Sequence, residues 1–314
     1  MDAGLSWICL TSLIRAAVMG GRDGNSMENV LMTRSPRHNQ RIRMADSLRA
    51  VLLFFIFVNP AFAQTDVLIE VDRARSEGLF TPTPVYQRAI LSKPAQPATI
   101  ALLYFRGNPG IAQIQSVADK TRNLTTFMRI NEQLFMDEKI ALVVMDCATD
   151  KWRGCAESYR LSEAYADDVR SVIRVLKDVH GLTEIYLMGH SMGASSSRGL
   201  ARTLGNEIAG GIHSAAMNVA APNGFGSSFS GFAYDKLVTP QLHIHNQNDA
   251  CRSTPYWPVK GYAGNNLTTV IGGTAEGDPC GGGHLHSHQG RETLVVKTVI
   301  AWIKTKTVVP VIGE

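Results

Sequence analysis

Short apolar runs alternate with segments of helical periodicity along the chain after Gln64. This alternation is typical of an α/β protein, in which a mostly parallel sheet carries helices on both faces. The pattern predicts eight strands, and the first two should pair antiparallel because only proline-containing turn material separates them. The predicted strands are Val67–Val71, Val85–Leu91, Ile100–Phe105, Ala141–Cys147, Ile185–Met188, Gly211–Val219, Gln241–His245 and Thr268–Ile271.

Helical segments are predicted between the later strands. The clearest is Ser162–His180, where apolar side chains recur on one face and Gly181 supplies a stop signal. Further helices are expected at Leu124–Glu138 and Leu294–Ile303. The Pro-, Gly- and Ser-rich segment Ala221–Ser230 predicts a loop or at most a small lid.

Residues 44–64 have the features of a secretory signal peptide. The apolar run Ala50–Val58 is followed by an Asn-Pro pair and by Ala61 and Ala63, whose small side chains suit a cleavage site before Gln64. The run is shorter than the roughly 20 residues that span a bilayer, so a membrane anchor is the weaker interpretation. We expect residues 1–63 to be an upstream extension plus a removed signal peptide, and residues 64–314 to form one domain that is periplasmic or secreted.

The charge of the expected mature chain argues against a nucleic-acid partner. Residues 1–63 carry seven basic and four acidic side chains, so the formal net charge of +4 falls to +1 without them. A nearly neutral domain has no strong electrostatic footprint for nucleic acid or anionic membranes.

Four of the five cysteines lie in the expected mature chain: Cys147, Cys155, Cys251 and Cys280. An even number in an exported protein favours disulfides over metal binding, and no pair has the Cys-x-x-Cys spacing of a zinc site. The sequence leaves all three pairings open.

The segment Gly189-His190-Ser191-Met192-Gly193 carries the strongest chemical signal. It follows the fifth predicted strand and precedes a predicted helix, Ala194–Leu204, which is the context of a nucleophile elbow. The alternative is a flexible Gly/Ser loop. With the strand order, this motif resembles the α/β-hydrolase superfamily, in particular exported serine esterases and lipase-like hydrolases, over Thr99 to Trp302. The resemblance implies that Ser191 is the nucleophile.

A serine nucleophile needs a base and an acid, in the chain order Ser, Asp or Glu, His. Asp249 follows the seventh predicted strand and resembles the family's His-Gly-x-x-Asp step, with Asn246 in place of glycine. The resemblance implies that Asp249 is the acid, although an Asn-Asp turn is the alternative interpretation.

Three histidines, His284, His286 and His288, precede the last helix, where the family keeps its base. The family pattern His-Gly-Phe-x-Gly-x-Glu matches His286, Gly290 and Glu292, so His286 is the predicted base and His284 the main alternative. A strand-like alternation would put all three histidines on one side without an acidic or cysteine partner, so a metal site is disfavoured.

Two backbone N–H groups should hold the oxyanion. One is that of Met192, which follows the nucleophile. The other is assigned by resemblance to Asn108, because Arg106-Gly107-Asn108-Pro109 is similar to the family's His-Gly-Asn-Pro step, with Arg106 replacing histidine. His190 is expected to be a packed residue of the elbow.

These assignments suggest a disulfide pairing. A Cys251–Cys280 bridge would join the loops that carry Asp249 and His286, and Cys147–Cys155 would then close the loop after the fourth strand. The sequence thus predicts an exported serine hydrolase that cleaves a carboxylic ester or related acyl bond of a small-molecule or acyl substrate, without cofactor or metal. The alternatives are an acyltransferase or serine peptidase with the same triad, or a non-catalytic binding protein on this scaffold.

Overall fold

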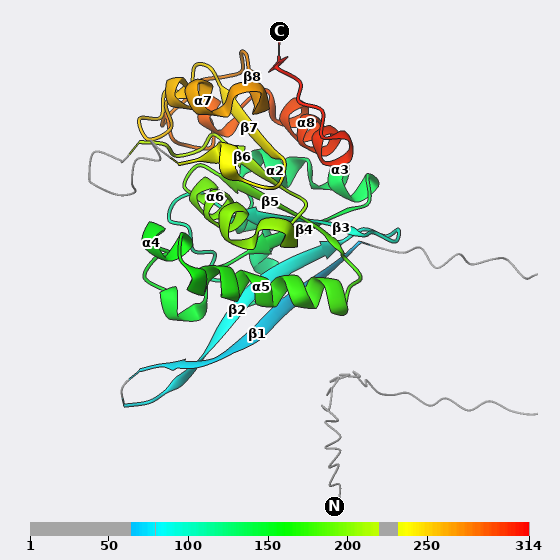
Figure 1. Ribbon diagram of the computed structural model, residues 1–314, viewed down its shortest axis with the longest axis vertical. Coiled ribbons are helices and arrows are strands. Elements are labelled where there is room, and N and C mark those ends of the chain that lie inside the picture. Colours follow the sequence, from blue (N-terminus) through cyan, green and yellow to red (C-terminus); the bar gives the residue numbers. More distant parts are fainter. Residues whose placement is uncertain (1–63, 79, 220–231, 314) are drawn as a thin grey trace, which may run out of the picture. The chain divides into compact units, whose positions relative to one another are not determined.

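The computed structural model describes residues 64–78, 80–219 and 232–313 (Figure 1). The predicted signal peptide and the predicted loop Ala221–Ser230 lie outside these residues. The strands are β1 Thr65–Glu77, β2 Thr83–Lys93, β3 Ile100–Phe105, β4 Ile140–Met145, β5 Glu184–His190, β6 Gly210–Ser214, β7 Gln241–Asn246, β8 Leu267–Val270 and β9 Val311–Ile312. The α-helices are α1 Lys120–Asn123, α2 Thr126–Ile130, α3 Glu132–Asp137, α4 Glu157–Arg160, α5 Glu163–Asp178, α6 Gly193–Leu204, α7 Tyr256–Ala263 and α8 Glu292–Thr305.

All described strands belong to one sheet with the order β1-β2-β4-β3-β5-β6-β7-β8-β9. β1 pairs antiparallel with β2, β2 pairs antiparallel with β4, and the remaining pairs are parallel. The antiparallel start and the parallel remainder are therefore confirmed. The expected number of eight strands is wrong by one, because the two-residue β9 also pairs with β8.

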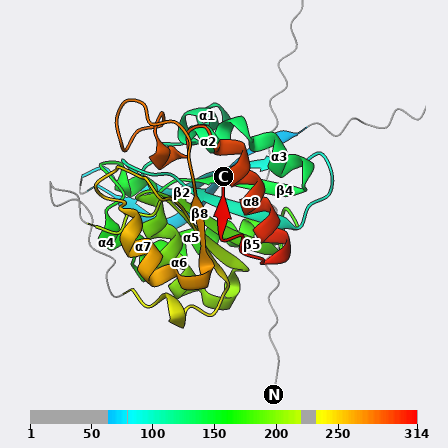
Figure 2. The same ribbon diagram turned by 90° about the horizontal axis from the view of Figure 1, so that it is seen from above.

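Helices cover both faces of the sheet, as predicted (Figures 1 and 2). Along β3, Leu102 and Tyr104 pack with α2, α3 and α8, whereas Leu103 and Phe105 point to the opposite face and pack with α5 and α6. This alternation follows from the two-residue period of a strand. The central strands are thus buried on both sides, and their carboxyl ends present loops at one edge of the sheet.

One predicted helix is divided in two. Asn131 separates α2 from α3 within the expected Leu124–Glu138 helix, and its buried side chain donates from Nδ2 to the backbone oxygen of Phe127 at 2.8 Å. An asparagine amide competes in this way with backbone donors and favours a helix boundary. The predicted helix at Ser162 is confirmed as α5, and the Ser162 hydroxyl accepts a hydrogen bond from the Tyr165 N–H at 3.2 Å.

Strand β6 is shorter than predicted and ends at Ser214 instead of Val219. The next residue, Ala215, has a φ of 40°, which no extended strand adopts. The chain leaves the sheet here and passes along the candidate site. No helix in the described ranges combines the length and apolarity that a membrane span requires.

Candidate active site

Ser191 lies on a sharp turn between β5 and α6, and its φ is 55°. Such a conformation is unfavourable for a side chain larger than glycine and needs support from its surroundings. A Cβ at Gly189 would lie 2.2 Å from the backbone oxygen of Gly193, and a Cβ at Gly193 would lie 2.0 Å from that of Phe105. The two glycines of the motif are therefore required by close backbone packing.

Backbone hydrogen bonds fix this turn against the end of β6. The Ser191 N–H donates to the Ser214 oxygen at 2.9 Å, and the Ser191 oxygen accepts from the Met217 N–H at 3.1 Å. The hydroxyl of Ser214 also contacts His190 Nδ1 at 3.1 Å and His288 Nε2 at 2.8 Å. One serine thus connects the turn to two buried imidazoles.

The structure brings Asp249 and His286 together. Asp249 follows β7, His286 precedes α8, and Asp249 Oδ2 lies 2.9 Å from His286 Nδ1. Both side chains are almost completely buried. This contact orients the imidazole so that Nε2 is available for another partner.

The Asp249 carboxylate has several further donors. Oδ1 accepts from the Cys251 N–H at 2.9 Å, and Oδ2 accepts from Thr254 Oγ1 at 2.8 Å and lies 3.3 Å from His245 Nε2. Burial alone would raise the pKa of the Asp249 carboxyl, but hydrogen bonds from His245 and His286 outweigh burial and hold this pKa well below its ordinary value. Asp249 is therefore ionised at neutral pH.

The other two histidines of the segment have different surroundings. The expected strand-like alternation is wrong, because residues Leu285–Ser287 form a 3-10 turn and His288 has a φ of 60°. His288 is buried against Ser214, and burial lowers its pKa to about 3. His284 is also buried, and within the described chain its Nδ1 has no hydrogen-bond partner. The hydrogen bonds and ion pairs of the Asp249 carboxylate go to other residues, among them His286 and His245.

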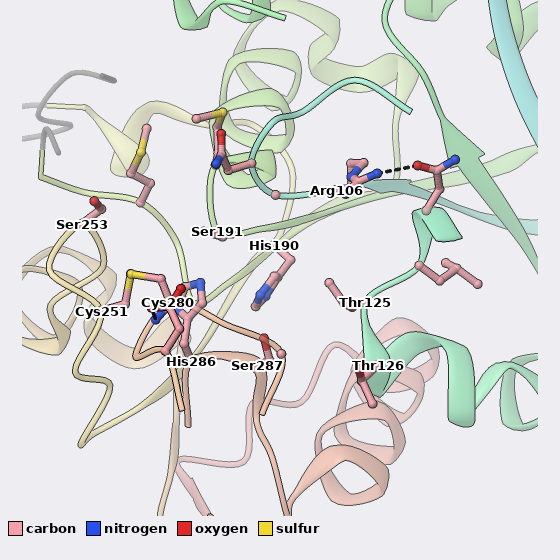
Figure 3. Close-up of a pocket in the computed structure, with 18 of the residues that line it drawn as sticks. Arg106, Thr125, Thr126, His190, Ser191, Cys251, Ser253, Cys280, His286 and Ser287 are labelled. Atoms are coloured by element: carbon pink, nitrogen blue, oxygen red, sulfur yellow. Dashed lines mark hydrogen bonds between the residues drawn. A yellow bond between two sulfur atoms is a disulfide. The ribbon is translucent and has the colours of Figure 1, made fainter. Parts of the chain in front are cut away.

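Ser191 and His286 line the same cavity, which has a volume of about 660 Å³ (Figure 3). Within the described ranges no hydrogen bond joins their side chains, and His286 bonds through Nδ1 to Asp249 and Thr254 instead. Other lining residues come from the loop after β3, from residues 122–126, and from the loops after β7 and β8. The cavity thus opens where the carboxyl ends of the central parallel strands meet.

Both predicted oxyanion donors line this cavity. Met192 caps the N-terminus of α6, and Asn108 follows Gly107, where a Cβ would lie only 3.2 Å from the Ser191 Cβ. Across the described segments, neither the Met192 N–H nor the Asn108 N–H has a hydrogen-bond acceptor. Two cavity-lining residues thus have backbone N–H groups without a backbone acceptor in the described part of the chain.

Two disulfides join the four cysteines as Cys147–Cys155 and Cys251–Cys280. The second bridge lines the cavity and connects the loop of Asp249 with the loop of His286 (Figure 3). No cluster of three or more His, Cys, Asp or Glu side chains in the described residues is arranged to hold a metal ion.

Several residues of the site were missed by the sequence analysis. His245 and Thr254 contact Asp249, and Ser214 links His190 to His288. The available signal was position, since Ser214 ends β6, the neighbour of β5, and His245 lies near the end of β7, the next strand of the sheet. Their contacts arise from tertiary packing, which no local motif encodes.

No protein-family model and no curated protein matches the chain. Among solved structures, an esterase from Pyrococcus furiosus is similar with a TM-score of 0.51 and 11% identity, over 78% of this chain and 94% of that one. Est1E from Butyrivibrio proteoclasticus is similar with a TM-score of 0.49 and 15% identity, over 76% of this chain and 97% of that one. The strand order, the turn at Ser191 and the similarity to the Pyrococcus esterase show that the chain has the α/β-hydrolase fold.

Proposed function

We propose that this protein is an exported serine hydrolase that cleaves carboxylic esters with Ser191, His286 and Asp249. The observation that carries the proposal is the 2.9 Å contact between Asp249 and His286 at the cavity that Ser191 also lines. These are the residue types and the chain order of a hydrolase triad. The similarity to an esterase supports a hydrolase at the level of the fold.

In the proposed reaction, Ser191 Oγ attacks the ester carbonyl while His286 Nε2 takes the hydroxyl proton. The carbonyl oxygen becomes an oxyanion that accepts hydrogen bonds from the Met192 and Asn108 N–H groups. Collapse of this intermediate expels the alcohol, which receives the proton from His286. Water then attacks the acyl-enzyme, again with His286 as the base, and releases the acid and free Ser191.

Asp249 supports this cycle electrostatically. Its carboxylate stays charged because hydrogen bonds from His245 and His286 lower its pKa despite burial. It therefore stabilises the imidazolium that forms on His286 and holds the ring with Nδ1 toward the carboxylate. The Thr254 hydroxyl donates to Asp249 Oδ2, the oxygen that also contacts His286, and helps to fix the carboxylate in place.

Export is proposed on two grounds. The segment before Gln64 has the pattern of a signal peptide, and the two disulfides are compatible with an oxidising compartment. Both bridges lie in loops at the carboxyl edge of the sheet.

Labelling with an active-site-directed fluorophosphonate tests the function. The probe should form a covalent adduct with the wild-type protein and none with Ser191→Ala. Ser253→Ala is a matched control, because Ser253 lines the same cavity without lying on the elbow, and this variant should still be labelled. Absence of labelling in a folded wild-type protein would contradict the proposal and favour a non-catalytic role.

A further inference from the structure

Arg106 lines the candidate active site beside the residues that contact the nucleophile. It is the first residue after β3 and directly precedes Gly107, which packs against Ser191. An arginine side chain in this place brings a permanent positive charge to the edge of the reaction centre. Its surroundings therefore indicate what kind of substrate the cavity accepts.

The partner of the Arg106 guanidinium is a neutral amide. Nη1 donates to Asn123 Oδ1 at 2.6 Å, which is the dashed contact beside the Arg106 label in Figure 3. Asn123 is fixed in turn, because its Nδ2 donates to the backbone oxygens of Ala112 at 3.0 Å and Asp119 at 2.9 Å. The guanidinium is thus held in position while most of its five N–H groups have no acceptor in the described part of the chain.

No described carboxylate forms an ion pair with Arg106. The carboxylate of Asp146 attracts the Arg106 guanidinium electrostatically without pairing with it. Its oxygens accept the backbone N–H groups of Ala112 at 2.7 Å and Ile114 at 2.8 Å. The second arginine of the cavity differs, since Arg122 pairs with Asp119 at 2.9 Å. Among the residues that the structure describes, Arg106 is therefore the cavity arginine that has no adjacent carboxylate.

The charged residues that line the cavity also favour an anionic ligand. Two arginines, Arg106 and Arg122, line it together with one aspartate, Asp278, whose Oδ1 accepts the Cys280 N–H at 3.0 Å. Burial lowers the pKa of Arg106, and repulsion from Arg122 adds to this effect. A half-buried cation without a counter-ion is costly, and an anionic ligand would offset that cost.

We propose that Arg106 binds a carboxylate of the substrate, so that the enzyme prefers esters carrying a free carboxylate over neutral esters. This inference rests on the proposed ester hydrolase function. Arg106 and Ser191 line the same cavity, so an acid bound at the guanidinium would lie in the space that also contains the nucleophile. A guanidinium suits this role because it presents paired N–H groups to both carboxylate oxygens.

The test compares kcat/KM for matched esters. One pair is a half-ester of a short dicarboxylic acid and the ester of the monocarboxylic acid of equal length, which places the charge on the acyl side. A second pair is the acetyl ester of a hydroxy acid and that of its amide, which places the charge on the alcohol side. The wild-type enzyme should prefer the anionic member of at least one pair by about tenfold or more, the usual range for a hydrogen bond to a charged group.

Arg106→Gln should reduce this preference, measured as the ratio of kcat/KM for the anionic and the neutral ester, at least tenfold and mainly through the KM of the anionic ester. Arg106→Lys should keep part of the preference, because it keeps the charge and loses the paired geometry. Arg122→Gln is the matched control and should keep most of the preference, since Arg122 is paired with Asp119 and half-exposed. Circular dichroism should show that each variant is folded.

If Arg106→Gln does not fold, the wild-type enzyme still provides a test, because salt should weaken the anionic preference and leave the neutral ester unaffected. Equal kcat/KM for both members of both pairs would overturn the inference. An equal loss of the anionic preference in Arg106→Gln and Arg122→Gln would also overturn the inference, because the preference would then come from the overall positive potential of the cavity and not from binding at Arg106. In both cases, Ser191-dependent cleavage of the neutral esters would still support the proposed ester hydrolase function.

Discussion

Opening the Cys251–Cys280 disulfide should lower activity before it unfolds the protein. This bridge joins the loop that follows β7 and carries Asp249 to the loop that precedes α8 and carries His286. The Cys251 N–H also donates to Asp249 at 2.9 Å. Replacing both cysteines by serine would therefore release two loops that hold the proposed acid and the proposed base in contact.

The separation of 29 residues sets the size of the effect on stability. In the chain-entropy model, closing a loop of this length stabilises the folded state by about 3–4 kcal/mol. The Cys147–Cys155 bridge spans 8 residues, and the same model gives it about 2–3 kcal/mol. The effects on activity should differ more, because displacing a catalytic group by about 1 Å can cost about 10²-fold in rate.

The assay combines urea unfolding with ester hydrolysis in wild-type protein, Cys251→Ser/Cys280→Ser and Cys147→Ser/Cys155→Ser. Both variants should be less stable, and only the first should lose about tenfold or more of its kcat/KM under conditions where it is fully folded. Equal activity of the two variants would refute the idea that the Cys251–Cys280 bridge positions the acid and base. An unchanged unfolding free energy in the first variant would refute the entropic estimate.

Three further predictions concern single positions and the N-terminus. In ester hydrolysis assays, His286→Ala should lose at least about 10³-fold in kcat, whereas His284→Ala should keep a substantial part of the wild-type kcat. The reverse result would assign the role of the base to His284. Gly193→Ala should destabilise the protein by more than about 2 kcal/mol in urea unfolding, because the added Cβ would lie 2.0 Å from a backbone oxygen. Gly261→Ala in α7, where the space around the added Cβ is open, should be neutral or stabilising. Equal changes in the unfolding free energy of the two variants would refute the steric account. The exported protein should begin at Gln64 in N-terminal mass spectrometry, and residues 1–63 retained in it would refute signal cleavage.

The elements best predicted from the sequence were those with strong local signals. β3 was predicted with its observed bounds because it is a continuous apolar run between polar flanks. The turn at Ser191 was predicted because two glycines, a serine and a preceding apolar strand specify it locally. These features depend on neighbours in the chain and are therefore visible without the fold.

Features that depend on distant contacts were missed. β1 extends to Glu77, well beyond the predicted Val71, because its pairing with β2 resumes at Ser76 after a register shift and Arg75 forms ion pairs with Asp150 and Asp168. β9 is too short to show any periodicity and exists through its pairing with β8. The choice among three histidines likewise depended on which one the folded loops bring to Asp249, and the family pattern alone pointed to His286.

Steady-state ester hydrolysis by Ser191→Ala tests the central claim most directly. The assay uses a chromogenic short-chain ester, with circular dichroism to show that the variant is folded. If Ser191 forms the acyl-enzyme, its removal should lower kcat at least about 10³-fold, because the remaining cavity offers only oxyanion donors and substrate binding. A folded Ser191→Ala protein that hydrolyses the ester at a rate close to that of the wild-type enzyme would contradict the claim.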